Sequence, residues 1–392
     1  MTYKQIGRKE LTAITGPLGK NSVKKMREIS PLLAESLVEH AFGNILAAST
    51  LPRRERELVT IGLLGAMGGA EPQLRTHLEA ALRVGADPDE LIALAEHLSV
   101  YAGYPRALNL LRETRSILAD KNLCTLKETR KVSLNDHNTR VFDSGGVKPA
   151  LVLIHALAMD WRMWREVIPN LTTNFRVIAY DIRGFGCAAG APPAQGLETY
   201  ALDLSSLLNK LGVAKAHIAG LSLGGSIAQH LALKAPSRFH SLTIIATTAW
   251  PFEAFAQRAD AAIFTGMDAQ IIPSLTRWFR PEDLAENGWG VRYARENVQR
   301  VFVSDWQAGW MALATIETGK RLNEITVPTH IVAGELDAST PPELMKGFLD
   351  IPKASFEMIA NAPHMISLVY PHELAAAITR GTGLKPPAPN TK

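Results

Sequence analysis

A serine set between glycines is the residue in this sequence that is best placed to act as a nucleophile. Gly220–Gly225 reads Gly-Leu-Ser-Leu-Gly-Gly, with Ser222 at the centre of a Gly-x-Ser-x-Gly motif. The apolar run Ala216–Leu221 before it favours a strand, and Ser226–Ala235 after it favours a helix. A sharp strand-to-helix turn needs minimal side chains around the serine and presents its hydroxyl at a helix head, where the dipole favours negative charge. We therefore predict a nucleophile elbow, although a tight glycine turn would also explain the motif by itself.

Two later residues could supply the base and the orienting acid that a serine nucleophile needs. In folds with a nucleophile elbow, these groups follow later strands in the order serine, acid, histidine. Asp337 follows the strand pattern Thr329–Glu335, and His364 follows Ser355–Ala360. Glu335 is the competing acid, in a less favourable position. The predicted catalytic triad is Ser222, Asp337 and His364.

Backbone amides near the nucleophile could stabilise the negative charge of a tetrahedral intermediate. The amide of Leu223 directly follows the serine. The second donor should lie in the loop after the first central strand, where Ala156 and Leu157 are both candidates. His155 opens this loop, and we interpret it as a packing residue that transfers no proton.

The first part of the chain holds a different group of candidates, Glu57, His77 and His97. A carboxylate and an imidazole on adjacent antiparallel helices could form an acid/base pair that moves a proton at the carbon next to a carbonyl. The alternative is that these histidines pack on helical faces and do no chemistry.

The elements that must position these groups fall into two regions. From about Ser30 to Leu118, apolar residues recur at helical spacing and no strand-like alternation interrupts them. We therefore predict an all-α domain over residues 1–122. Its expected helices are Pro31–Ala48, Arg54–Met67, Pro72–Val84, Asp87–Tyr101 and Pro105–Leu118.

After about residue 123, short apolar runs alternate with amphipathic helices, which predicts a mostly parallel sheet with helices on both faces. A hairpin around 135–138 opens this second domain, expected over residues 129–380. Residues 251–321 are helical and rich in aromatic side chains, so we predict a helical cap inserted in the domain. The proline-containing end, 381–392, is expected to be disordered, and the domain boundary is expected between Ala119 and Thr129.

Composition narrows the class of protein. The chain has 392 residues, 46% of them hydrophobic and 20% charged, which indicates a globular protein of two or three domains. Its net charge of +4 does not favour a nucleic-acid partner. The only cysteines, Cys124 and Cys187, exclude a disulfide scaffold and a cysteine-rich zinc module. Residues 1–10 are polar and basic without an apolar core, so we expect no signal sequence, and no apolar run reaches the roughly 20 residues of a membrane span. We expect a cytoplasmic protein with no cofactor, metal or membrane partner.

The second domain resembles the α/β-hydrolase superfamily and, within it, the 3-oxoadipate enol-lactonases. The matching segments are His155–Trp164, Tyr180–Gly186, Gly220–Gly225, Gly334–Pro341 and Ala362–Met365. The resemblance places the nucleophile, acid and base of that family on the same predicted triad. The chain departs from the family at Cys187, where a serine-containing loop is usual, and at Pro363, where a glycine is usual.

The first domain resembles the carboxymuconolactone decarboxylase family over roughly Leu32 to Leu118. The matching segments are Arg54–Ile61, Gly68–His77 and His97–Pro105. Members are helical trimers or hexamers, so the resemblance implies a homo-oligomer. A related peroxidase branch carries cysteines where this chain has Ala70 and Gln73, which disfavours peroxidase chemistry. The decarboxylases commonly have an arginine in a segment that here reads Leu46-Ala-Ala-Ser-Thr50.

Together the resemblances imply two consecutive steps of the 3-oxoadipate pathway: decarboxylation of 4-carboxymuconolactone and opening of the resulting enol-lactone. Our leading hypothesis is a bifunctional enzyme of this type acting on a small lactone or ester. Two alternatives remain. One is a serine hydrolase of another ester, thioester or lactone whose helical domain is altered or serves for oligomerisation. The other is a non-catalytic small-molecule receptor on a hydrolase scaffold.

Overall fold

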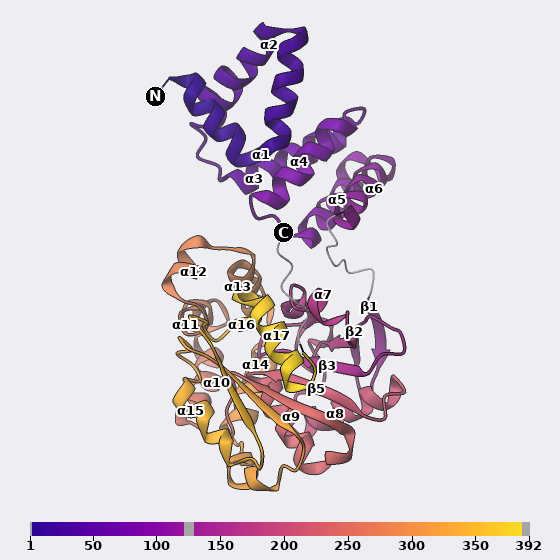
Figure 1. The fold of residues 1–392 in the computed structure, drawn as a ribbon, viewed down its shortest axis with the longest axis vertical. Helices are drawn as coiled ribbons and strands as arrows, with labels where there is room; N and C mark the ends of the chain where they lie inside the picture. Colours follow the sequence, from indigo (N-terminus) through magenta and orange to yellow (C-terminus); the bar gives the residue numbers. More distant parts are fainter. Residues whose placement is uncertain (1, 121–128, 386–392) are drawn as a thin grey trace. The chain divides into compact units, whose positions relative to one another are not determined.

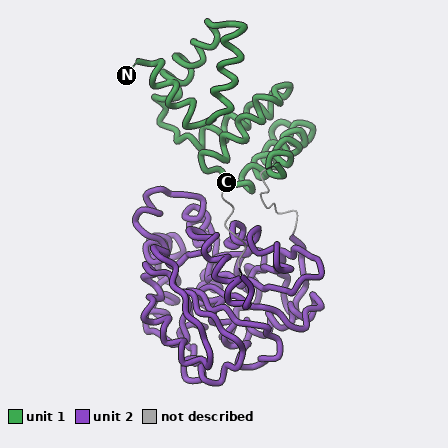
Figure 2. Tube along the Cα trace, viewed as in Figure 1, with its two compact units in different colours: residues 1–127 green, residues 128–392 purple. Residues whose placement is uncertain are grey.

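The chain divides into two compact units, residues 1–127 and residues 128–392 (Figure 2). We describe each unit separately, from a computed structural model that describes residues 2–120 and 129–385. The predicted boundary region, 119–129, and the end of the predicted disordered tail therefore fall largely outside the described residues. No helix in the described part of the chain is long and apolar enough to cross a membrane.

The first unit is entirely helical within its described residues. Its elements, in chain order, are α1 (Tyr3–Ile29), α2 (Pro31–Ser36), the π-helix η1 (Leu37–Leu46), α3 (Arg53–Met67), α4 (Glu71–Arg83), α5 (Pro88–Ala102) and α6 (Tyr104–Asp120). Buried side chains of α3 to α6 form one apolar core, around residues such as Ile61, Leu78 and Leu110. The fold class predicted for this region is confirmed.

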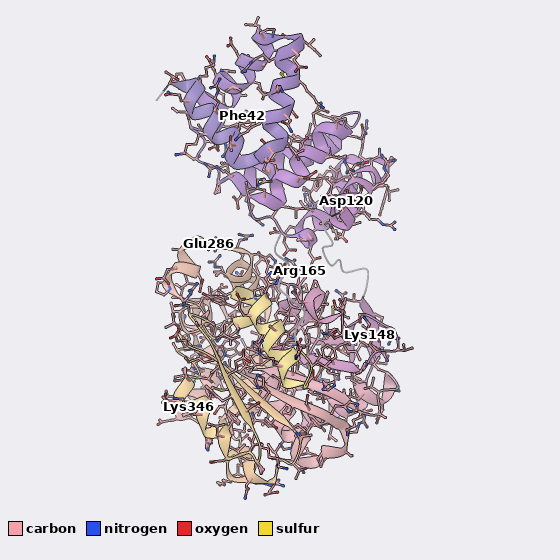
Figure 3. All side chains as sticks on the ribbon, viewed as in Figure 1. Phe42, Asp120, Lys148, Arg165, Glu286 and Lys346 are labelled. Carbon is pink, nitrogen blue, oxygen red and sulfur yellow. The ribbon has the colours of Figure 1, made fainter. Side chains whose placement is uncertain are left out.

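Helix α1 was not anticipated from the sequence. The helix expected over residues 31–48 is instead α2 continued by the π-helix η1, which packs against α1. Glycines allow α1 and η1 to approach closely: a Cβ on Gly7 would overlap the carbonyl oxygen of Val38, and one on Gly43 would overlap that of Tyr3. Phe42, labelled in Figure 3, is buried in the second apolar core that these helices form. Because small residues make this contact, the periodic apolar signal of α1 is weak.

The second unit is built on one eight-stranded sheet with strand order β1-β2-β4-β3-β5-β6-β7-β8 (Figure 1). The edge strands β1 and β2 form an antiparallel hairpin, and β2 also pairs antiparallel with β4. All pairs from β4 through β8 are parallel. The strands are β1 (Thr129–Ser133), β2 (Asn138–Asp143), β3 (Ala150–Ile154), β4 (Arg176–Tyr180), β5 (Ala216–Leu221), β6 (Phe239–Ile245), β7 (Thr329–Gly334) and β8 (Ser355–Ile359). The predicted mostly parallel sheet is confirmed.

Helices pack along this sheet. Helix α9 (Leu223–Lys234) contacts β5 and β6, with α8 (Leu197–Lys210) beside it. Helix α17 (Pro371–Gly381) contacts β6, β7 and β8, with the short α7 (Ile168–Leu171) beside it. Strands β3 and β5 to β8 end at the same edge of the sheet because they run parallel, so the loops that follow them come together there.

Five helices are inserted between β6 and β7: α10 (Glu253–Thr265), α11 (Asp268–Trp278), α12 (Pro281–Glu286), α13 (Trp289–Arg300) and α14 (Val303–Ala314). We call this insertion the cap. Aromatic side chains such as Phe255, Trp278, Trp306 and Trp310 are buried in it. Helix α17 continues to Gly381, so the predicted disordered tail begins inside a helix, and residues 386–392 lie outside the described residues.

Candidate active site

The turn at Ser222 joins β5 to α9 and holds the serine in a strained conformation. Its φ of 54° and ψ of −119° are unusual for a residue with a side chain. The glycines around it are required by close approach. A Cβ on Gly220 would overlap the carbonyl of Gly224, and one on Gly224 would overlap the carbonyl oxygen of Ile154 on β3. The turn therefore requires glycine at these positions for steric reasons, and it places Ser222 at the start of α9.

His364 and Asp337 lie side by side in the loops after β8 and β7. The histidine Nδ1 is 2.8 Å from Asp337 Oδ2, and both side chains are almost completely buried. Asp337 is held by the turn that follows it, because its Oδ1 accepts the backbone N–H groups of Ser339 (2.7 Å) and Thr340 (2.9 Å). The Thr340 hydroxyl donates to Oδ2 at 2.7 Å. The carboxylate is thus fixed in position and fully hydrogen-bonded.

A cavity joins these loops to the cap. Ser222 and His364 both line it, together with Leu157 from the loop after β3. Cap residues such as Phe255 and Trp310 complete its wall. The serine and the histidine therefore line the same cavity, to which the cap contributes the aromatic side chains of Phe255, Trp278 and Trp310.

The backbone amides of Leu223 and Ala156, both near Ser222, differ in whether they already have a hydrogen-bond acceptor. Leu223 is the first residue of α9, so its N–H has no acceptor within the helix. The N–H of Ala156 donates to the thioether sulfur of Met163 at 3.2 Å. Because that amide already has a partner, Leu157 is the better second donor of the two candidates considered from the sequence.

The cap is tied to the loop after β3 by Tyr293, on α13. The backbone N–H of Asp160 donates to the Tyr293 hydroxyl at 3.0 Å. The same hydroxyl lies 3.0 Å from Asp160 Oδ1 and 3.2 Å from the Asp160 carbonyl oxygen, either of which can accept its proton. Asp160 is three residues beyond Leu157, so this contact holds the loop that carries the candidate amide. Sequence reasoning missed Tyr293.

In the helical unit, the structure brings Glu57 and His77 together. His77 Nδ1 on α4 is 2.7 Å from Glu57 Oε2 on α3. Glu57 is buried, and a quarter of the His77 side chain is exposed. His97 is not part of this pair: it is exposed on α5 and packs against Tyr101 of the same helix, with ring centroids 4.9 Å apart. Of the three candidates, the structure therefore brings together Glu57 and His77 and leaves His97 on the surface.

Residues 149–371, more than half of the chain, match the model of the alpha/beta hydrolase fold. The chain belongs to the α/β-hydrolase family. Residues 31–116 match the carboxymuconolactone decarboxylase family. Both resemblances inferred from the motifs are therefore confirmed, and the α/β-hydrolase match covers the strands and loops that carry the candidate site.

Relatives of the hydrolase unit include lactonases and esterases. The chain is 27% identical over 230 residues to 3-oxoadipate enol-lactonase 1 of Acinetobacter baylyi, covering 57% of this chain and 85% of that protein. It is 26% identical over 258 residues to the pimeloyl-[acyl-carrier protein] methyl ester esterase of Aeromonas hydrophila, covering 61% and 97%. The enol-lactonase structure from Burkholderia xenovorans LB400 shares the fold, with a TM-score of 0.62, 22% identity and coverage of 65% and 100%.

Other polar residues of the α/β-hydrolase unit hold its loops. His155 Nδ1 donates to the Ala156 carbonyl at 2.7 Å, and its Nε2 accepts the Ile182 N–H at 2.8 Å. Burial lowers the pKa of His155 to about 4, so it stays neutral, as expected for a packing histidine. Glu335, the competing acid, is exposed and accepts the Asn361 N–H at 2.8 Å. It lies outside the cavity that Ser222 lines.

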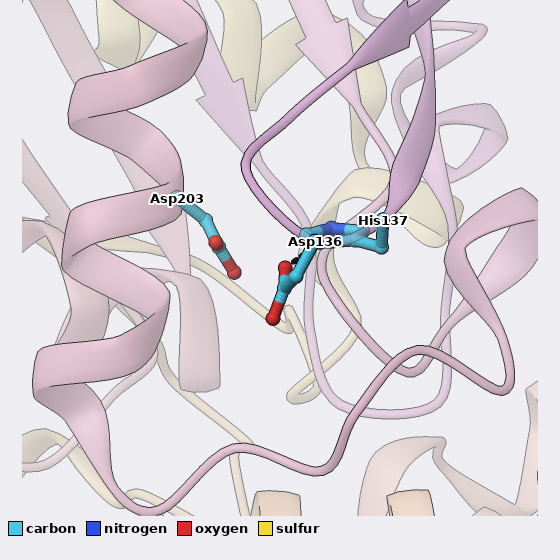
Figure 4. A group of neighbouring side chains, drawn as sticks. All are labelled: Asp136, His137 and Asp203. Carbon is cyan, nitrogen blue, oxygen red and sulfur yellow. Dashed lines mark hydrogen bonds and ion pairs between the residues drawn. The ribbon is translucent and has the colours of Figure 1, made fainter.

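Two aspartates and a histidine near the β1–β2 hairpin lie close enough together to hold a metal ion. Asp136, His137 and Asp203 place their ligand atoms close together, and the two carboxylates point into the same space (Figure 4). The Arg183 guanidinium already binds both carboxylates, at 2.7 Å to Asp203 and 2.7 Å to Asp136. The cation in this cluster is thus an arginine, and the cluster fixes the loop after β4.

Proposed function

We propose that the second unit is a serine hydrolase that opens a small lactone, of the 3-oxoadipate enol-lactone type. The observation that carries the proposal is the arrangement around one cavity: a strained serine at an elbow, and a histidine whose Nδ1 is 2.8 Å from a buried aspartate. Its lactonase and esterase relatives support the same chemistry.

The reaction begins with attack of Ser222 Oγ on the lactone carbonyl carbon. Because Nδ1 of His364 is bonded to Asp337, Nε2 is the ring atom that takes the serine proton. The resulting oxyanion accepts hydrogen bonds from the amides of Leu223 and Leu157. Collapse of the intermediate breaks the ring C–O bond, and His364 returns the proton to the departing enol oxygen.

The second half of the reaction releases the product. In a lactone the leaving oxygen stays attached to the acyl chain, so the acyl-enzyme holds the whole ring-opened molecule. Water, deprotonated by His364, attacks the acyl carbon and restores Ser222. The carboxylate product leaves, and its enol rearranges to the ketone.

For the helical unit we propose a decarboxylase-like site centred on Glu57 and His77. Loss of carbon dioxide from a lactone carboxylate leaves a carbanion next to a carbonyl, and an imidazole held by a buried carboxylate is suited to protonate it. The family match supports this role. The absence of the usual arginine before Leu51 favours, as a second candidate, a unit whose role is assembly.

The surface of the helical unit supports assembly in either case. Val59, Leu63 and Met67 lie at four-residue intervals on α3 and are 54%, 62% and 66% exposed. Such an exposed apolar stripe supports an interface with another protein chain. We propose a homo-oligomer, a trimer or hexamer, formed through this unit, and sedimentation of the intact chain measures its size.

Substitution of Ser222 tests the proposal. We expect Ser222→Ala to abolish both the burst and the turnover of 4-nitrophenyl acetate and the hydrolysis of enol-lactone, because no other group in the cavity replaces an activated serine. Ser237→Ala, at an exposed serine of the same unit, is the matched control and should keep full activity. A burst that persists in Ser222→Ala would contradict the proposal. Hydrolysis of simple esters without enol-lactone would favour another ester as substrate.

A further inference from the structure

A positively charged side chain lies in the wall of the cavity, which is otherwise largely apolar in its cap portion. Arg258, on α10, lines the cavity together with Ser222 and His364. Its guanidinium lies over two aromatic rings, 5.6 Å from the centroid of Phe255 and 5.0 Å from that of Trp310. These rings orient the guanidinium without neutralising it.

A second arginine, Arg277 on α11, is close enough for the charge of Arg258 to act on it. Burial first, and the charge of Arg258 second, lower the pKa of Arg277 to about 10. Its Nε is buried without a hydrogen-bond partner, and its Nη2 reaches only the Ser274 hydroxyl at 3.4 Å. Its carbonyl oxygen accepts the hydroxyl of Ser339, another residue of the cavity wall, at 3.3 Å.

No carboxylate in the described ranges 2–120 and 129–385 forms an ion pair with either arginine, and burial lowers the pKa of Arg258 as well. Arg280, also in the cap, is by contrast paired with a carboxylate, because it binds Asp283 at 2.6 Å. Two neighbouring, partly buried cations without a counter-ion cost free energy, so a site that keeps them needs an anion.

We propose that Arg258, supported by Arg277, forms a subsite for a carboxylate carried by the substrate at the end opposite the reacting carbonyl. This deepens the proposed function, on which it rests, because it assigns the residues that recognise the free carboxylate of such a lactone. A guanidinium matches the two oxygens of a carboxylate. The remote charge fixes the substrate so that its carbonyl meets Ser222, and it excludes neutral esters of the same size.

The test compares 4-nitrophenyl esters that carry a terminal carboxylate with one that does not. The mono-4-nitrophenyl esters of succinic, glutaric and adipic acid carry one, and 4-nitrophenyl butyrate does not. We expect the native chain to prefer at least one anionic ester in kcat/KM by roughly 10-fold or more, and Arg258→Met to lose roughly 10- to 100-fold of that preference. Arg258→Lys should restore part of it, and Arg277→Met should lose a smaller part.

Arg300→Gln is the control for cap charge, because Arg300 is exposed on α13, and it should leave the preference unchanged. A structural role for Arg258 would lower the melting temperature and both rates equally, without changing their ratio. Neutral-ester hydrolysis with no anionic preference, or a preference that Arg258→Met keeps, would overturn the subsite while leaving the hydrolase intact.

A binding measurement decides the subsite even if none of the four esters is hydrolysed, a result that would count against the proposed function instead. Glutarate should raise the melting temperature of the native chain and should do so far less in Arg258→Met. Equal stabilisation of the two proteins would overturn the carboxylate subsite. Inorganic phosphate in the same assay serves as a second anion, and equal protection by phosphate and glutarate would overturn selectivity for a carboxylate.

Discussion

Each unit contains a histidine that is hydrogen-bonded to a carboxylate, but the surroundings of the two pairs differ. His364 lies 2.8 Å from Asp337, and His77 lies 2.7 Å from Glu57. The first pair is buried and lines a cavity with a serine, and its aspartate accepts three further hydrogen bonds. Within the described residues, Glu57 accepts a hydrogen bond from His77 alone, and the histidine is a quarter exposed. An imidazole–carboxylate pair therefore does not define a reaction, because the groups around it do.

Removal of the Asp337 charge in the α/β-hydrolase unit should have the largest effect on activity. We expect Asp337→Asn to lower kcat for ester hydrolysis roughly 10³- to 10⁴-fold, because an amide no longer selects the histidine tautomer that accepts the serine proton. Steady-state kinetics with 4-nitrophenyl esters measure this. Glu335→Gln, at the exposed acid two residues earlier, should change kcat less than twofold. The reverse result would make Glu335 the orienting acid.

Removal of the Glu57 charge in the helical unit should affect decarboxylation and not ester hydrolysis. We expect Glu57→Gln to lower decarboxylation of 4-carboxymuconolactone roughly 10²- to 10⁴-fold, the usual contribution of a positioned acid or base, while ester hydrolysis is unchanged. Carbon dioxide release measures the first activity. Glu96→Gln, at an exposed glutamate of α5, is the control.

The result for Glu57→Gln distinguishes a catalytic role of the Glu57–His77 pair from a purely structural one. If the native chain releases no carbon dioxide and Glu57→Gln only lowers the melting temperature, the pair holds α3 against α4 and does no chemistry. The comparison between the units would then be between a working site and a structural remnant, and assembly would be the remaining function of the helices.

Sequence reasoning could locate the groups that directly follow strands. Ser222, Asp337 and His364 each come just after a strand of the parallel sheet, and that topology brings strand ends to one edge. The alternation of apolar runs and helices, which predicted the sheet, is a local signal. The glycines at 220 and 224 are also local, because the turn itself requires them.

Contacts made by the cap could not be predicted in this way. Tyr293 meets Asp160 across 133 residues, and nothing in the spacing of α13 indicates that its hydroxyl faces the loop after β3. The sequence pattern also does not rank the cap arginines, such as Arg277 and Arg280, as partners for a substrate carboxylate. Packing shows that Arg280 is already bound to Asp283, and it adds Arg258, which the pattern did not identify.

The smallest effect should come from the tyrosine that ties the cap to the hydrolase loop. Tyr293→Phe leaves the buried N–H of Asp160 without its acceptor, so the loop that carries Leu157 loses one anchor. We expect kcat for ester hydrolysis to fall roughly 5- to 20-fold with a smaller change in KM, because a misplaced amide weakens binding of the oxyanion and not of the ester.

Tyr370→Phe is the matched control for that substitution, because the Tyr370 hydroxyl accepts a hydrogen bond from Arg280 of the cap at 3.0 Å and, among the described residues, forms no hydrogen bond with the loop after β3. It should lower kcat less than twofold. If both variants lose kcat equally, the cap acts through its general packing. If only Tyr293→Phe lowers kcat, the hydrolase site depends on the specific contact between Tyr293 and Asp160. The described residues of the helical unit contain no cap that could make a comparable contact with the His77–Glu57 pair.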